Sequence, residues 1–335
     1  MAGEWRDMTL GDFVTLQRGH DLTEPERRVG RIPVMGSAGQ NGFHGTALAN
    51  GLGIAEQKAI AAVLGALDDK IQLNRRMNAT LEAMARALFQ SWFVDFDPVR
   101  VKLDGRQPVG MDEATHVFFP DSFEDSPVGH IPAGWTVESI SACCDRIHGG
   151  GTPRRDEPPY WIQGTIPGLT SGEVRQPMIT ATENFITDLG LKESSEKWVP
   201  ANTIVVALYG ATAGQVSFLG TTATTNQAIC SLIPKPQFEF FNSFAMRNST
   251  AEMENKAVGS AQQNISKGII EETVVVLPPT EVLRHFNLVA GPLFGTWIAN
   301  IKQSHTLATL RDTLLPKLLS GESSVAGAEC ILEGT

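Results

Sequence analysis

Two stretches of the chain repeat one pattern of apolar positions, with spacings that alternate between four and three residues. The ten positions of the first stretch are Ile60, Leu64, Leu67, Ile71, Asn74, Asn78, Leu81, Ala85, Leu88 and Trp92. Adding 226 to each number gives the second stretch: Phe286, Ala290, Leu293, Trp297, Asn300, Ser304, Leu307, Arg311, Leu314 and Leu318. Polar residues interrupt both stretches at the fifth and sixth positions. The pattern is typical of a coiled coil, in which apolar residues face a partner helix, so we predict two long helices that pack on each other.

A single amphipathic helix in a globular core would show a similar apolar stripe, and this alternative stays open for either stretch taken alone. The shared polar interruptions favour paired helices, because a polar residue inside such a seam fixes its register. A helix over residues 55–93 would be roughly 58 Å long at 1.5 Å per residue. That length exceeds a compact domain and predicts a spacer.

A second repeat has a different offset. A glycine and a tryptophan occur close together at the start of each copy, with Trp5 in the first and Trp135 in the second, and apolar residues follow at similar spacing. The tryptophans are 130 residues apart and the helices 226, so the first half lacks about 96 residues that the second half has. We therefore expect the segment before the first helix to be a truncated copy of the domain that precedes the second.

These offsets predict an α+β protein in six parts. Their ranges are a truncated remnant at 1–53, the first helix at 54–97, a connector at 98–131, a mixed α/β domain at 132–279, the second helix at 280–320 and a tail at 321–335. The clearest strand patterns of the domain are 203–208 and 273–277, which are rich in β-branched residues. Asp97-Pro98 is expected to end the first helix and Pro316 the second, and Gly291-Pro292 to kink or delay the second.

The composition narrows the class of protein. Hydrophobic residues make up 42% of the chain, but no apolar run reaches the roughly 18 residues of a membrane span, so we expect a cytoplasmic protein without membrane contact. The four cysteines form no CxxC pair and have no histidine at metal-ligand spacing, which predicts reduced, structural thiols. A net charge of −10 argues against a free-standing nucleic-acid binder, because a DNA-binding surface is normally basic. A role on DNA would need local basic loops or a basic partner.

Glycines and arginines are concentrated at the start of the α/β domain. Gly149-Gly150-Gly151-Thr152-Pro153 is followed by Arg154 and Arg155. Glycine lets the backbone approach a phosphate, and arginine binds a phosphate or a guanine edge with two hydrogen bonds. The segment lacks the GxxxxGK[ST] spacing of a phosphate-binding loop. A flexible turn with two solvated arginines is the alternative interpretation.

Two further loops combine glycine with polar side chains. Residues 208–214 turn sharply after a predicted strand, and residues 259–267 contain Gln262, Gln263 and Asn264. Glutamine and asparagine can bind adenine with two hydrogen bonds. Ordinary loops that satisfy their own backbone would have the same composition, so this alternative also stays open.

One segment of the chain comes close to a catalytic motif. Glu157-Pro158-Pro159-Tyr160 differs by one residue from the [DN]PPY motif of amino-group DNA methyltransferases, and no glycine-rich cofactor loop accompanies it. No Ser-His-Asp or Cys-His arrangement is suggested by spacing. We therefore expect no catalytic residues, no metal and no cofactor.

Taken together, the residues resemble the specificity subunit of Type I restriction-modification enzymes over about residues 54–320. In the first helix, residues 55–64, 67–71 and Ser91-Trp92-Phe93-Val94-Asp95-Phe96-Asp97-Pro98 look like the family's central helix. Five later segments are similar to one type of its target-recognition domain: Gly150-Gly151-Thr152-Pro153, Leu169-Thr170-Ser171-Gly172-Glu173, residues 207–214, Thr225-Asn226-Gln227-Ala228 and Asn264-Ile265-Ser266-Lys267.

The resemblance implies two target-recognition domains held apart by antiparallel spacer helices, each reading half of a split double-stranded DNA site. Methylation and cleavage would come from separate modification and restriction subunits. The expected DNA-binding residues are Thr152, Arg154, Arg155, Ser171, Tyr209, Thr212, Gln263, Asn264 and Lys267.

The chain departs from the family in its first half, where only the opening of a recognition domain is present, through Phe43-His44-Gly45. Smaller departures are Gln263, where the family often has proline, and Val282, where the family has glutamate. A structural adaptor that holds modification subunits without selecting DNA is the main alternative function, and an independent methyltransferase is a third. With one complete domain, a split target would require two chains, so a homodimer is also an expectation.

Overall fold

The computed structural model describes residues 32–36, 39–44, 54–108, 110–256 and 264–325. The chain divides into two compact units. One comprises residues 67–310, and the other combines residues 1–66 with 311–335. The predicted truncated remnant at 1–53 is described only as the backbone of the antiparallel hairpin β1 (Ile32–Gly36) and β2 (Gly39–His44). The rest of that segment lies outside the described residues.

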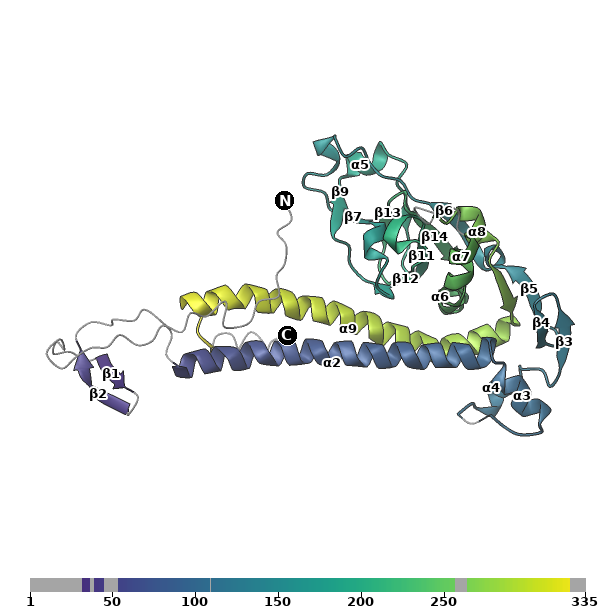
Figure 1. Cartoon of the computed structure of the whole chain (residues 1–335), viewed down its shortest axis with the longest axis horizontal. Coiled ribbons are helices and arrows are strands. Elements are labelled where there is room, and N and C mark those ends of the chain that lie inside the picture. Colours follow the sequence, from purple (N-terminus) through teal and green to yellow (C-terminus); the bar gives the residue numbers. More distant parts are fainter. Residues whose placement is uncertain (1–31, 37–38, 45–53, 109, 257–263, 326–335) are drawn as a thin grey trace. The chain divides into compact units, whose positions relative to one another are not determined.

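Two long helices run antiparallel, as Figure 1 shows: α2 (Ile54–Phe93) and α9 (Thr280–Ser320). Near the end of α2 the ring of Trp92 lies 5.9 Å from that of Phe286, near the start of α9. Further back on α2, Asn74 donates from Nδ2 to the carbonyl oxygen of Asn300 at 3.3 Å. The prediction of two long helices packed along one seam is confirmed.

The polar centre of the seam has an internal two-fold symmetry. Asn74 Nδ2 donates to Ser304 Oγ at 3.3 Å, and Asn300 Nδ2 donates to Asn78 Oδ1 at 3.0 Å. Asn74 and Asn300 are equivalent positions of the repeat, 226 residues apart, and so are Asn78 and Ser304. The repeat therefore exchanges one hydrogen bond for the other. Asn74 is fully buried. The shared polar interruptions in the sequence are therefore the hydrogen-bonded middle of the helix pair.

The unit that contains the chain ends also buries apolar residues of both helices. Ile60 and Val63 of α2 are buried there, as are Leu314 and Leu318 of α9. This unit contains the start of α2 and the end of α9, and both bury apolar side chains in it.

The predicted range 280–320 of the second helix matches α9, but the expected helix stops at Asp97-Pro98 and Pro316 were wrong. Helix α2 ends at Phe93, and Asp97-Pro98 instead begins a new helix, α3 (Asp97–Leu103), where proline suits the first turn because its missing N–H would be unpaired anyway. Helix α9 is assigned as one helix through Pro292 and Pro316 as far as Ser320. A proline costs an interior helix about 3 kcal/mol, and apolar burial along the seam on both sides of it offsets that cost.

The connector between α2 and the α/β domain contains secondary structure of its own. It comprises α3, α4 (Glu113–His116) and the hairpin of β3 (Phe123–Ser126) with β4 (Gly129–Pro132). Thr115 Oγ1 lies 2.9 Å from His285 Nδ1 of α9, and the ring of Phe119 meets that of Trp92 edge-on at 5.2 Å. The connector is therefore packed against the helix pair.

The α/β domain is built on two sheets. The larger has the strand order β6 (Cys144–Gly149), β14 (Ile229–Pro234), β11 (Thr203–Ala207), β12 (Val216–Leu219) and β8 (Met178–Ile179), antiparallel except for the β12–β8 pair. The smaller has the order β10 (Trp198–Val199), β13 (Ala223–Thr225), β7 (Ile166–Leu169) and β9 (Asn184–Ile186). Strand β15 (Val274–Leu277) pairs with β5 (Thr136–Ser139) and joins the two ends of the domain. The predicted strands 203–208 and 273–277 are confirmed to within one residue at each end.

An aromatic cluster joins the domain to the helix pair. Helix α6 (Glu239–Asn248) places Phe241 and Phe244 at 5.6 and 5.5 Å from the ring of Phe89 on α2. Phe218 of the large sheet packs against Phe294 of α9 at 4.9 Å. The remaining described helices of the domain are short: α5 (Asp188–Lys192), α7 (Thr250–Lys256) and α8 (Lys267–Glu271). No described helix is both long and apolar enough to cross a membrane.

Candidate nucleic-acid interface

The turn at residues 225–228, between β13 and β14, brings together three of the loop segments that the sequence singled out. The N–H of Gly151 donates to the carbonyl of Thr225 at 3.0 Å, and the N–H of Gln227 approaches Thr152 Oγ1 at 3.4 Å. On its other sides, the N–H of Asn226 donates to Leu169 and the N–H of Leu208 donates to Ala228. Segments separated by up to 75 residues in the chain thus form one loop cluster.

The 208–214 and 259–267 loops also meet. Tyr209 and Asn264 form an isolated antiparallel β-bridge, and the N–H of Ile265 donates to the carbonyl of Leu208 at 3.0 Å. Gly210 and Gly214 have φ of +75° and +82°, which glycine adopts without strain, so the chain can reverse here. Tyr209 and Asn264 are exposed, and Tyr209 keeps 47% of its surface accessible. The fold therefore presents a tyrosine and an asparagine side by side.

Close packing explains the glycines of the 149–151 segment. A Cβ at Gly150 would lie 2.1 Å from the carbonyl oxygen of Thr225, and a Cβ at Gly151 would lie 2.5 Å from the backbone nitrogen of Glu196. Neither distance is possible for a side chain. At Gly149, by contrast, a Cβ would meet nothing within 4 Å. Gly150 lets the loop lie directly on the 225–228 turn, and Gly151 lets it lie against the backbone of residues 195–196.

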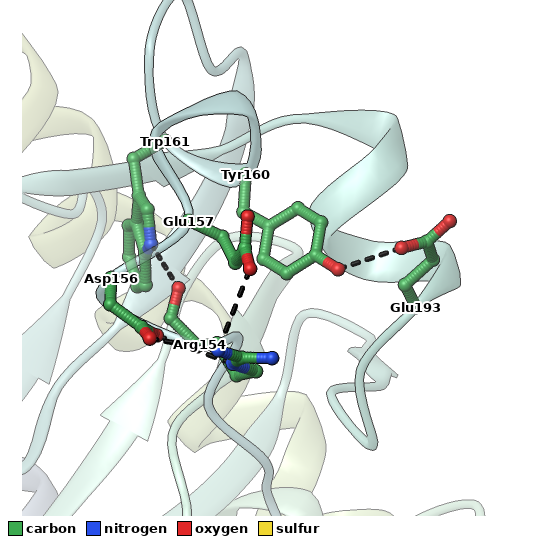
Figure 2. Close-up of polar contacts among 6 residues, drawn as sticks. All are labelled: Arg154, Asp156, Glu157, Tyr160, Trp161 and Glu193. Carbon is green, nitrogen blue, oxygen red and sulfur yellow. Dashed lines mark hydrogen bonds and ion pairs between the residues drawn. The ribbon is translucent and has the colours of Figure 1, made fainter.

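The two arginines after this loop have different surroundings, and Figure 2 draws those of Arg154. Arg154 Nη2 forms an ion pair with Asp156 Oδ2 at 2.8 Å and a longer one with Glu157 Oε1 at 3.5 Å. The guanidinium of Arg155 lies over the ring of Trp161, 5.6 Å from its centroid. Two carboxylates therefore balance the charge of Arg154, whereas Arg155 stacks on an aromatic face and remains exposed.

The methyltransferase-like near-motif is a short 3-10 turn, η3 (Pro158–Tyr160). Figure 2 shows that its tyrosine points toward Glu193: the Tyr160 hydroxyl donates to Glu193 Oε2 at 2.7 Å. This bond raises the pKa of Tyr160. Glu157 is used by Arg154, so the polar groups of the turn hold neighbouring loops together. Among the described residues, no group of three or more His, Cys, Asp or Glu side chains could hold a metal ion.

The other predicted DNA-binding residues vary in exposure. Lys267 is exposed at the start of α8 and pairs with Glu271 at 2.8 Å, while Thr152 and Ser171 are half-buried. Thr212 is only 4% exposed, so its side chain offers a DNA duplex no surface in this structure. Gln263 lies outside the described residues. The structure thus brings Thr152, Tyr209 and Asn264 into the loop cluster and leaves Thr212 inside it.

Sequence reasoning missed a group of basic residues around His148, to which Lys267 belongs. Burial lowers the pKa of His148, and the nearby positive charges of Arg146, Lys197 and Lys267 lower it further, against a hydrogen bond to the Gly149 carbonyl that raises it. Arg146 and Lys197 are exposed. The available signal was the period of two in a strand, which puts residues 146 and 148 on one face of β6. Lys197 could not be placed there from sequence, because it comes from a distant loop.

A buried acid lies below the loop cluster. Glu196 is 6% exposed and lines a hollow with Thr152, Arg155, Thr170 and Asn226. Thr224 Oγ1 donates to Glu196 Oε1 at 2.7 Å, and no described group bonds to the buried Oε2. Burial raises the pKa of Glu196 to about 7, and the bond from Thr224 lowers it only in part. No motif in the sequence indicated this residue.

A domain with exposed polar loops, joined by an aromatic cluster to a pair of antiparallel helices, is the architecture of a specificity module carried on a spacer. Comparison with known proteins agrees: residues 132–282 match the family model described as the Type I restriction modification DNA specificity domain. The α/β domain therefore belongs to the Type I restriction modification DNA specificity domain family.

Individual relatives support this assignment. The HindI specificity subunit of Haemophilus influenzae is 29% identical, with 79% of this chain and 67% of that protein covered. The MjaIX specificity subunit of Methanocaldococcus jannaschii is 27% identical, with 81% and 59% covered. The crystal structure of the M. genitalium S subunit has a similar fold, with a TM-score of 0.52 at 14% identity over 79% of this chain and 61% of that one. The chain spans about three fifths to two thirds of the length of these proteins.

Proposed function

We propose that this chain selects a DNA sequence as the non-catalytic specificity subunit of a Type I restriction-modification system. The observation that carries the proposal is the convergence of the 150–152, 169–171, 208–209 and 264–265 segments on and beside the 225–228 turn. In this role, methylation and cleavage are left to modification and restriction subunits. The complex would act on double-stranded DNA in the cytoplasm.

The residues of the loop cluster suit two kinds of DNA contact. Arg155, and the cations around His148, which are Arg146, Lys197 and Lys267, are suited to phosphate oxygens. Asn264 beside Tyr209, with Gln263 before it in the chain, is suited to base edges, since an amide can pair with adenine. Arg154 and Ser171 remain candidates at the rim, Arg154 only after exchange of its carboxylate partners.

The helix pair carries a surface suited to the modification subunits. Leu73, Met77 and Met84 of α2 are 45%, 39% and 52% exposed. Spacings of four and seven residues put all three on one face of the helix, and we call them the apolar stripe. Apolar side chains gathered on the exposed face of a spacer fit a protein partner.

A methylation map tests the proposal. The chain is co-expressed with modification subunits, and the methylated bases of the host DNA are sequenced. We expect one defined sequence to be marked. Asn264→Ala should reduce the preference for the correct base over the others by about 1 to 3 kcal/mol of binding free energy. Lys267→Ala and Arg155→Ala should instead weaken binding to all sequences alike. Arg106→Ala, in the connector, is the matched control. An unchanged map and unchanged affinity in all three interface variants would refute this assignment of the loops.

A structural adaptor is the second candidate function. It is favoured by the net charge of −10 and by the two carboxylates that balance Arg154. Such an adaptor would still assemble with modification subunits. It would bind no DNA sequence more tightly than a scrambled competitor at fixed salt. A competition assay that compares the two affinities therefore separates the two functions.

A further inference from the structure

Arg247 lies where the α/β domain meets both long helices. It stands near the end of α6, and only 11% of its side chain is exposed. Its Nη1 pairs with Glu82 Oε1 of α2 at 3.2 Å, and its Nη2 donates to the carbonyl oxygen of Pro177, just before β8. Its guanidinium also lies 6.0 Å from the ring centroid of Trp297 on α9. One side chain thus ties the domain to α2 and α9 at the same point.

Stability alone is a weak explanation for this arrangement. Burial lowers the pKa of Arg247 to about 10, so the guanidinium is still charged at neutral pH, and no described group bonds to its buried Nε. A buried ion pair often contributes no more stability than apolar side chains of similar volume would. What the guanidinium adds is direction, because its planar fork bonds only to partners at set angles. The contacts of Arg247 therefore define an orientation of the domain on the helices.

We propose that Arg247 is a positioning residue that sets the angle of the DNA-recognition domain on the spacer helices. It would thereby set the register in which bound DNA meets modification subunits held by those helices. This inference rests on the proposed function. A misplacement of about 1 Å in a reacting complex can cost about 100-fold in rate, so orientation can govern methylation without governing DNA affinity.

The test compares Arg247→Met, which keeps length and packing, with Arg247→Lys and a matched control. The control is Arg86→Ala, because Arg86 Nη2 lies at the same 3.2 Å from the same Glu82 oxygen but its side chain is 61% exposed. Each variant is assembled with modification subunits. We measure DNA affinity, the single-turnover methylation rate and the thermal midpoint.

For Arg247→Met we expect an affinity within about threefold of wild type and methylation slower by about 10- to 100-fold. The midpoint should fall, because the variant removes one partner of a buried ion pair. Arg247→Lys should recover part of the rate, and Arg86→Ala should match wild type. An unchanged rate in Arg247→Met overturns the proposal. So does a parallel fall of affinity, rate and midpoint, which would show a merely structural role.

A second measurement does not depend on DNA recognition. Spin labels at exposed positions Arg75 on α2 and Lys192 in the domain report their distance distribution by pulsed electron resonance in the full chain. Arg247→Met should broaden or shift this distribution, and an unchanged distribution overturns the proposal. A broadened distribution in a chain that selects no DNA sequence would instead show that the positioning role holds and the proposed function fails.

Discussion

At the scale of single residues, a buried acid lies next to the loop cluster. Glu196 is nearly inaccessible to water, and one hydroxyl is its described hydrogen-bond donor. The backbone of Gly151 is packed directly against that of Glu196. Charging this carboxyl therefore acts against the packing that holds the glycine loop in place.

We predict that the stability of the chain falls as pH rises through neutrality. The native pKa of Glu196 is raised from 4.5 to about 7, so the native state binds the proton more tightly than the unfolded state does. The resulting stabilisation is complete below about pH 4.5 and is lost as pH rises through about 7. Glu196→Gln keeps the shape without the charge. It should be more stable than wild type at about pH 8, by about 1 to 2 kcal/mol, since water at the mouth of the hollow screens part of the effect.

Urea unfolding at about pH 5.5 and about pH 8 measures this difference. Glu183→Gln, which replaces an exposed acid of the same domain, is the control. It should change the free energy of unfolding by the same amount at both pH values. Equal pH dependence of wild type and Glu196→Gln would contradict the prediction.

At the scale of elements, the position of the glycine loop depends on what lies beneath it. Gly150→Ala forces a Cβ against the Thr225 carbonyl, which is backbone and cannot move aside alone. We expect the loop to lift from the 225–228 turn and DNA affinity to fall by about tenfold or more, the equivalent of about 1.4 kcal/mol. Gly149→Ala is the matched control, because a Cβ there meets open space. Equal affinities of the two variants would show that the loop does not contribute to binding in this position.

The polar middle of the helix pair is a second element with a measurable contribution. Asn74 Nδ2 lies within 3.3 Å of acceptors on Asn300, Gln303 and Ser304. Asn74→Ala removes these bonds from a buried site and should lower the free energy of unfolding by about 1 to 2 kcal/mol. Thr80→Ala, exposed on the same helix, should change it by less than about 0.5 kcal/mol. Urea titration compares the two, and a neutral Asn74→Ala would mean that the apolar positions alone hold the register.

At the scale of the whole molecule, two surfaces have separate roles, because the loop cluster lies on the α/β domain and the apolar stripe on α2. We predict that Met77→Glu with Met84→Glu prevents capture of modification subunits while leaving the thermal midpoint unchanged, since both residues are exposed. Arg75→Glu is the control, because a residue two positions before Met77 faces about 200° away on a helix. Co-purification on a tagged modification subunit measures capture. Full capture by the double variant would place the partner surface elsewhere.

The number of recognition domains determines the expected form of the DNA target. One domain reads one half-site, so a split site would require two chains related by a two-fold axis and would be an inverted repeat. We predict a palindromic methylation mark and two copies of this chain in the active complex by light scattering. A single copy that marks an asymmetric two-part sequence would contradict the half-site argument. The seam between α2 and α9 is already filled within one chain, so pairing would need another surface.

The sequence alone predicted the helix pair, its polar centre and the α/β domain, because a repeat with a period near 3.5 and two clear strands are local patterns that persist through folding. It gave the range of the second helix, but its expected stop at Pro316 was wrong, since the proline rule describes an isolated helix and burial along the seam outweighs it there. It named Thr152, Tyr209 and Asn264 but could not show that they share one loop cluster, which depends on hydrogen bonds between distant segments. Only the tertiary structure showed that Thr212 and Glu196 are buried and that Arg247 contacts both long helices. Their burial and their partners come from residues far away in the chain, and only the folded packing brings these together.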